Sequence, residues 1–242
     1  MDSAKADVAH DFYPWFRVYT DGSVERFLES PLVPPSLDVR SKDIAISTTA
    51  CARLFLPKAA PNEKLPLLIY IHGGFFSIES PFSSTYHGYV NSLVSQSKVI
   101  AVSIEYRLAP ENPVPACYDD CYAVMKWVAQ HKDSAHRPGL VPWLSEHADF
   151  GKAEPGCASV FAVEAAVCEK VLIFTTGLDQ YRQRGCTYYA ALKKSGWEDP
   201  VEIENTPGED HVFHLSDPTS DKAKAMMKKV ASFINPANAA SL

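Results

Sequence analysis

The sequence has no excess of positive charge. Its 242 residues carry 23 Lys and Arg against 29 Asp and Glu, a formal net charge of −6, which argues against binding to nucleic acid or to an anionic membrane surface. No apolar run approaches the roughly 20 residues of a membrane-spanning helix, and residues 1–12 lack the basic start and apolar core of a signal peptide. N-glycosylation sequons are also absent. These absences predict a cytoplasmic protein.

Paired cysteine motifs are missing too. The six cysteines form no CxxC pair, and none stands at metal-ligand spacing with a histidine: Cys51, Cys117, Cys121, Cys157, Cys168 and Cys186. They are predicted to be reduced, mostly structural thiols. No phosphate-binding P-loop and no GxGxxG motif occurs either. We therefore expect no metal, nucleotide or redox cofactor.

The composition, 46% hydrophobic and 21% charged, is that of an ordinary globular protein. Because α/β domains often reach roughly 250 residues, we expect one domain over residues 1–242. The first part alternates short β-type runs with polar turns and predicts a small antiparallel start to a sheet, over Trp15–Thr20, Val24–Phe27, Asp43–Ser47 and Ala52–Leu56.

From residue 65 the pattern changes to buried strands that alternate with amphipathic helices. Strands are predicted at Leu65–Ile71, Val99–Tyr106, Lys170–Thr175 and Val201–Glu204, and helices at Ser84–Gln96, Ala116–His131, Tyr181–Ser195 and Ser220–Ile234. This alternation indicates an α/β fold with a mostly parallel sheet flanked by helices. Residues 132–169 give no clear pattern, because Pro138, Pro142 and Pro155 interrupt any long element.

Three segments indicate chemistry. His72, Gly73 and Gly74 follow a buried strand, and such a turn can aim backbone N–H groups at a developing oxyanion. Asp179 and His211 follow two later strands, in the order expected for the acid and the base of a catalytic triad. Each feature also has an ordinary interpretation, as a plain turn, a helix cap or a surface histidine.

Four stretches together resemble the plant carboxylesterases of the hormone-sensitive-lipase class. They are IYIHGGFFSIESPFSSTYH, VIAVSIEYRLAPENPVPACYDDCYAVMKWV, WLSEHADFGK, and CEKVLIFTTGLDQYRQRGCTYYAALKKSGW with GEDHVFHL. The resemblance implies an α/β-hydrolase fold, Asp179 as triad acid, His211 as triad base, and His72 to Gly74 as the oxyanion turn. It implies a small carboxylic ester, or another small apolar molecule, as the partner.

The nucleophile elbow of that family is missing. A GxSxG elbow needs two glycines four positions apart, and no two of the eleven glycines have this spacing. Only about 18 residues separate Lys152 from the strand that begins at Val171, whereas one βα unit takes on the order of 30. We therefore expect an internal deletion with its scar near residues 152–168, and we assign no nucleophile.

Two substitutes for the nucleophile were considered, and both are predicted to be ordinary loop residues. Cys157 and Ser159 lie near the expected scar, but neither has small residues on both sides at elbow spacing. A second departure from the family is Phe75, which stands where a third glycine or an alanine is usual. A large side chain there could change how the turn presents its N–H groups.

Three hypotheses follow. The chain is a carboxylesterase-like hydrolase that is weak or inactive without its serine; or it is an inactive relative that binds a small apolar ligand or a partner protein; or it is an unstable truncated product. Loss of central strands would expose sheet edges, which predicts possible self-association.

Overall fold

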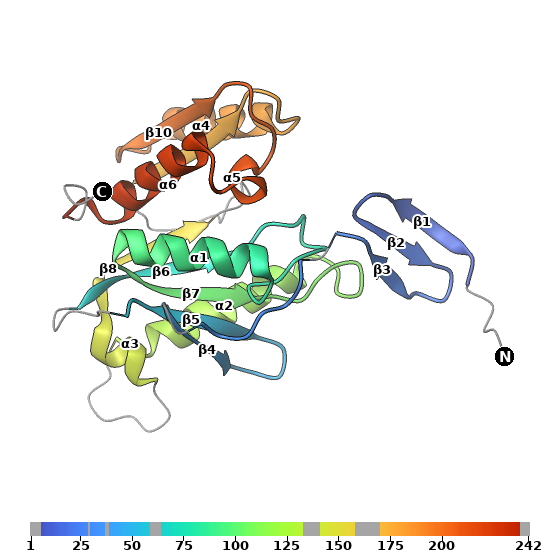
Figure 1. Ribbon diagram of the computed structural model, residues 1–242, viewed down its shortest axis with the longest axis horizontal. Helices are drawn as coiled ribbons and strands as arrows, with labels where there is room; N and C mark the ends of the chain where they lie inside the picture. The colour runs from blue at the N-terminus through green and yellow to red at the C-terminus, as the bar shows by residue number, and fades with distance from the viewer. Residues whose placement is uncertain are drawn as a thin grey trace.

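The computed structural model describes residues 6–28, 30–36, 39–58, 64–132, 141–157 and 170–237, with the backbone alone for residues 152–157. These residues form ten strands and six helices (Figure 1). The strands make three hydrogen-bonded sheets, of five, three and two strands. None of the helices in these ranges is long and apolar enough to cross a membrane, and these ranges contain no group of three or more His, Cys, Asp and Glu placed to hold a metal ion.

The five-stranded sheet is the centre of the molecule, with strand order β4-β5-β7-β6-β8. Its strands are β4 (Arg40–Ala45), β5 (Cys51–Leu56), β6 (Leu65–Ile71), β7 (Ile100–Glu105) and β8 (Ala148–Cys157). The pairs β6/β7 and β6/β8 are parallel, whereas β4/β5 and β5/β7 are antiparallel. The predicted α/β class is therefore confirmed, and β4 and β5 form an antiparallel start to this sheet. Two corrections follow: the described sheet is mixed rather than mostly parallel, and the runs predicted at Trp15–Thr20 and Val24–Phe27 belong to a separate sheet.

The three-stranded sheet is separate from the central one and projects from one end of it in Figure 1. It consists of β1 (Val8–Phe12), β2 (Phe16–Tyr19) and β3 (Val24–Arg26), all antiparallel. The sequence pattern predicted β2 and β3 but missed β1. All residues of β1 are exposed, so its side chains lack the alternation of apolar and polar residues that reveals a half-buried strand.

Helices cover both faces of the central sheet. The helices are α1 (Ser84–Ser97), α2 (Ala116–Ala129), α3 (Pro142–His147), α4 (Arg182–Lys194), α5 (Phe213–Ser216) and α6 (Asp221–Ile234). Side chains of α2 and α3 share one buried cluster with the sheet, and side chains of α1 and α6 share the other. The hydroxyls of Ser83 and Ser220 cap α1 and α6, as expected for serine at a helix start.

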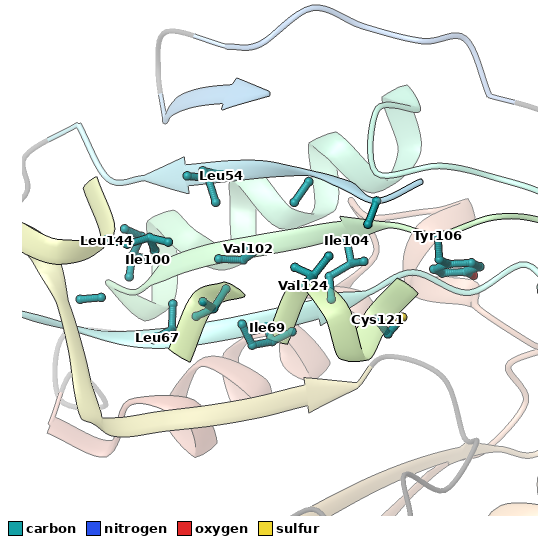
Figure 2. Packing of buried hydrophobic residues seen from close by; sticks show 14 of the residues in the cluster. Leu54, Leu67, Ile69, Ile100, Val102, Ile104, Tyr106, Cys121, Val124 and Leu144 are labelled. Atoms are coloured by element: carbon teal, nitrogen blue, oxygen red, sulfur yellow. The ribbon is translucent and has the colours of Figure 1, made fainter. Parts of the chain in front are cut away.

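Alternation along the strands divides the core into these two clusters. On β6, Leu67 and Ile69 face α2, whereas Leu68 and Tyr70 face α1. Figure 2 shows the cluster on the α2 side, where Val124 lies against the strands. Sheets covered on both faces explain the nearly continuous apolar runs in the sequence.

Strand β8 is a correction to the sequence analysis, which found no element in residues 132–169. Pro155 lies within β8, opposite Ile69 on β6. Among the described residues β8 pairs only with β6, so it is an edge strand, and an edge strand can accept a proline whose missing N–H faces away from the neighbour. Pro142 likewise begins α3, where its lack of an N–H costs nothing.

The two-stranded sheet contains β9 (Val171–Thr176) and β10 (Val201–Thr206), which pair in parallel. Helix α4 packs against this pair, and α6 packs against α1 of the central unit. Within the described ranges, no hydrogen-bonded ladder joins β9 to β8. The expected scar at residues 152–168 falls mostly outside the described residues.

Candidate active site

Asp179 and His211, predicted as triad acid and base, meet in the structure. Asp179 Oδ2 accepts a hydrogen bond from His211 Nδ1 at 2.9 Å. Because a carboxylate can only accept, the imidazole carries its proton on Nδ1, which leaves Nε2 as the atom able to accept another. The Asp179 side chain is 12% exposed and that of His211 is 44% exposed, so the base faces solvent while the acid is held below it.

Asp179 is oriented by the start of α4. Its second carboxylate oxygen, Oδ1, accepts from the backbone N–H of Tyr181 at 2.7 Å, and its carbonyl accepts from Arg182 N at 3.1 Å. A carboxylate at this position satisfies a backbone donor that the helix itself leaves without a partner. The local turn therefore fixes both oxygens, one on the helix and one on the histidine.

The loops after β9 and β10 are tied together, which brings Asp179 and His211 within reach. Leu178 N donates to Glu209 O at 2.9 Å, and Gly177 N donates to Thr206 O at 3.0 Å. A Cβ at Gly177 would lie 2.9 Å from Gly208 N, closer than real Cβ atoms come to backbone. Glycine at 177 thus permits the close approach of the two loops.

His72 plays a structural part in the HGG turn. It is 1% exposed, and its ring stacks on Tyr106 with centroids 4.2 Å apart. Nδ1 donates to the carbonyl of Gly73 at 2.7 Å, and the Tyr106 hydroxyl donates to the His72 carbonyl at 2.8 Å. Burial lowers the pKa of His72 to about 4, so this ring is neutral at pH 7 and is not a second acid.

The HGG turn has an unusual backbone. Gly74 has φ +114°, and a Cβ there would lie 2.2 Å from the Ile78 carbonyl oxygen. The next two residues, Phe75 and Phe76, also have positive φ, of 55° and 60°. Bulky residues adopt this left-handed region rarely and at a cost of about 1–3 kcal/mol each, most often at functional sites.

Phe75 connects the HGG turn to the pair formed by Asp179 and His211. Its ring lies 6.2 Å from that of His211 and nearly parallel to it, at 21°. It also lies 5.4 Å from the ring of Tyr181 and 5.9 Å from that of Trp15. The side chain that the sequence analysis marked as a departure from the family therefore packs between His211 and the N-terminal sheet.

A cavity of about 230 Å³ adjoins this cluster. It is mostly apolar and is lined by Phe12, Trp15, Phe16, Gly74, Phe75, Ser77, Ile78 and Tyr181. The lining joins residues 12–16 of the N-terminal sheet to the HGG turn and to the start of α4. Sequence reasoning missed the aromatic residues of this lining, because only the fold brings residues 12–16 beside residues 74–78.

Arg26 holds the N-terminal sheet to the site. It donates to the carbonyls of Ser77 and Ala109, at 2.6 and 3.1 Å, and forms a two-pronged pair with Glu111 at 2.7–2.8 Å. Glu111 closes the segment YRLAPE, and hydrogen bonding to Arg26 lowers its pKa. One guanidinium thus connects the sheet, the HGG turn and this segment.

The YRLAPE segment also contains a buried ion pair that sequence analysis missed. Asp120 belongs to α2. In the structure its carboxylate is 2% exposed and accepts from the backbone N, Nε and Nη2 of Arg107, at 2.8–2.9 Å. The pair anchors this segment to α2.

The end of β8 lies beside the end of β6, which leads into the HGG turn. Cys157 pairs with Ile71, the last residue of β6 before His72. This is a statement about backbone register only, because the side chain of Cys157 is not described and Ser159 lies outside the described residues. His214 lies in α5, where burial lowers its pKa to about 4, so it is not a charged second base at pH 7.

A glycine turn after an inner strand of the central sheet, with an acid and a histidine after the two parallel strands β9 and β10, is the arrangement expected of an α/β hydrolase. Residues 68–153 match a family model described as the alpha/beta hydrolase fold. The chain is 33% identical over 319 aligned positions to Probable carboxylesterase 5 of Arabidopsis thaliana, covering 95% of this chain and 99% of that one. The chain belongs to the plant carboxylesterase family.

Other relatives carry different names. The chain is 33% identical to a 2-hydroxyisoflavanone dehydratase of Glycyrrhiza echinata, with 94% of this chain and 96% of that one covered. Among solved structures, it is similar to an esterase of Pyrobaculum calidifontis, with a TM-score of 0.67, 22% identity, and 81% and 85% of the two chains covered. The structural match confirms the fold alone.

Proposed function

We propose that this chain binds a small apolar ester, or another small apolar molecule, beside Asp179 and His211 and hydrolyses esters weakly or not at all. The observation that carries this proposal is the assembled pair: His211 and Asp179 are joined at 2.9 Å next to the HGG turn, in a chain without a GxSxG elbow. An acid, a base and an oxyanion turn are present, and the serine is lacking.

The alignment lengths support an internal loss. The aligned part of this chain, 95% of 242 residues, is about 230 residues, yet the alignment with the Arabidopsis relative spans 319 positions. About 90 positions of that alignment therefore have no residue of this chain opposite them. The short stretch between β8 and β9, residues 158–170, is where an elbow helix and further strand would belong. We place the nucleophile among the lost residues.

Residual chemistry is still possible with the groups that remain. Nε2 of His211 can take a proton from a water molecule as that water attacks the ester carbonyl, and Asp179 stabilises the imidazolium that forms. In this proposal, backbone N–H groups of the Gly73–Gly74 turn stabilise the oxyanion. Without a serine there is no acyl-enzyme, so we expect a direct, slow attack by water.

Hydrolysis of p-nitrophenyl butyrate by purified, monodisperse protein tests this proposal. We expect slow turnover and no labelling by a fluorophosphonate probe, which reacts with activated serines. A His211→Ala variant is compared with a His147→Ala variant, because His147 ends α3 on the central unit, away from β9 and β10.

Fast turnover that falls at least about a hundredfold in His211→Ala, the scale of a lost general base, together with fluorophosphonate labelling, would overturn the proposal. An unrecognised nucleophile would then exist, and Cys157→Ala and Ser159→Ala variants would locate it. Slow turnover that is unchanged in both histidine variants supports ligand binding as the remaining function.

A second candidate function is dehydration, favoured by the relatives named 2-hydroxyisoflavanone dehydratase. Loss of water from a β-hydroxy ketone needs a base but no covalent nucleophile. His211 Nε2 would remove the proton from the carbon next to the carbonyl, the turn would hold the enolate oxygen, and hydroxide would leave with a proton as water. Incubation with a 2-hydroxyisoflavanone, with isoflavone formation followed in wild type and His211→Ala, tests it.

Three further expectations belong to this proposal. The chain acts as one domain over residues 1–242, and it acts in the cytoplasm. Because relatives named chloroplastic and mitochondrial occur in the family, a fluorescent fusion must test the location. Within the described residues, β8 and β9 each have a ladder partner on one side only. Self-association through these edges predicts a concentration-dependent mass in sedimentation experiments.

A further inference from the structure

On the basis of the ligand site proposed above, we infer that Phe75, Trp15 and Tyr181 form an aromatic clamp that selects a neutral aromatic group and holds it beside His211. The three rings come from three distant parts of the chain. Phe75 is the common member, 5.9 Å from Trp15 in an edge contact and 5.4 Å from Tyr181. Tyr181 in turn meets the ring of His211 edge-on at 5.4 Å.

The volume of the cavity is sufficient for one or two fused rings. Its volume is about 230 Å³, and an apolar cavity of about 150 Å³ suffices to hold benzene. Whole ligand pockets usually span about 300–1,000 Å³, so this cavity takes an aromatic substituent and leaves the rest of the ligand outside. Phe75 is 41% exposed and Phe12 is 47% exposed, so a ligand can reach these rings from solvent.

The charges around the cavity favour a neutral group over a cation. Five of its eight lining residues are aromatic and none is charged, and aromatic rings could also hold a quaternary ammonium group. However, the Arg26 guanidinium donates at 2.6 Å to the carbonyl of Ser77, a lining residue. Because this guanidinium is paired with Glu111, the wall offers no net negative charge that would attract a cation, whereas edge and offset contacts attract a neutral ring.

The backbone of Phe75 supports a functional role. A phenylalanine at φ 55° is strained, and a glycine would adopt this conformation freely. Its ring contacts Trp15, Tyr181 and His211. Backbone preference alone thus favours glycine over phenylalanine at position 75.

Saturation-transfer NMR titrations with 2-naphthol and with its saturated counterpart decahydro-2-naphthol test the clamp. We expect at least about fivefold tighter binding of the naphthol, because aromatic contacts add about two- to tenfold each beyond area burial. Phe75→Leu should weaken naphthol binding about five- to tenfold and change decahydronaphthol binding less than about twofold. Phe75→Tyr, which keeps a ring, should retain the preference, and its retention distinguishes clamp loss from misfolding.

Tyr122→Leu is the matched control, because Tyr122 is an exposed ring on α2 that does not line the cavity. Equal affinity for the two alcohols, an unchanged preference in Phe75→Leu, or preferred binding of phenyltrimethylammonium over naphthol would each overturn the clamp. The titrations require no turnover. Rapid, His211-dependent ester hydrolysis would thus refute the weak-hydrolase proposal without touching the clamp, and equal affinities would refute the clamp alone.

Discussion

Replacing Gly74 by alanine should disrupt the HGG turn and should destabilise the protein more than the same replacement at Gly22 or Gly88. The new Cβ would lie 2.2 Å from the carbonyl oxygen of Ile78, and the residue would keep φ near +114°. Neither atom can move cheaply, because Gly74 O accepts from Ser77 N at 2.9 Å and from Ile78 N at 3.0 Å.

The cost can be estimated from these contacts. Backbone strain for a non-glycine residue contributes about 1–3 kcal/mol, and loosening the two hydrogen bonds that close the turn adds about 0.5–1.5 kcal/mol each. We expect Gly74→Ala to lower the free energy of unfolding by about 3 kcal/mol. For a chain of this size that corresponds to a fall in Tm of about 6–12 °C.

Two other glycine-to-alanine variants separate strain from collision. Gly22 has φ +83° but nothing within 4 Å of an added Cβ, so it should lose only about 1 kcal/mol. Gly88 is exposed in α1, also with nothing within 4 Å, so alanine should stabilise by about 0.5–1 kcal/mol. Urea unfolding measures all three. A Gly74→Ala loss no greater than that of Gly22→Ala would refute the reasoning.

Two further predictions concern buried charge. Burial lowers the pKa of His72 from an ordinary 6.5 to about 4. The neutral ring therefore contributes about 3 kcal/mol to the free energy of unfolding above pH 6.5, and this contribution is lost as the pH falls from 6.5 to 4. The urea midpoint should therefore fall as the pH is lowered from 7 to 4. The pKa of His214 is also lowered to about 4, so this residue acts in the same pH range. His72→Gln should reduce the dependence of the midpoint on pH without abolishing it, and an unchanged dependence would contradict this prediction. Arg107→Met leaves the Asp120 carboxylate buried without its guanidinium and should destabilise by about 3 kcal/mol; adding Asp120→Asn should restore part of this, and no recovery would show that the charge is not the cause.

Local patterns predicted much of the fold. The apolar runs of β6 and β7 and the spacing of α1 and α6 were found within one or two residues, because a sheet buried on both faces leaves a continuous apolar signature. The misses have local causes as well. Prolines obscured α3 and β8, although Pro142 occupies a helix start and Pro155 lies in an edge strand. The tolerance of Pro155 could not be predicted, because whether a strand lies at an edge depends on its neighbours in space.

The candidate site likewise has a part that local sequence predicted and a part that it did not. Asp179 and His211 were predictable, because both follow parallel strands, and the carboxyl ends of parallel strands meet at one edge. The aromatic contacts of Phe75 were not, since they come from Trp15 and Tyr181, 60 positions before and 106 positions after it in the sequence. No periodicity connects residues at such separations.

The placement of the core bears on whether a chain with an internal loss can still fold. Among the described residues, most members of both buried clusters lie between Val39 and Ala148, before the expected scar, and Met227 on α6 is a buried member that follows it. The central sheet therefore buries both faces with its own helices, apart from the contribution of α6. The β9–β10 unit, which carries Asp179 and His211, contacts this core chiefly through the packing of α6 on α1 and through Phe75. The proposed loss of residues between β8 and β9 would thus remove strands from the end of the sheet and leave its centre closed. We expect the alignment of the Asp179–His211 pair with the HGG turn to be less stable than the core that supports the turn.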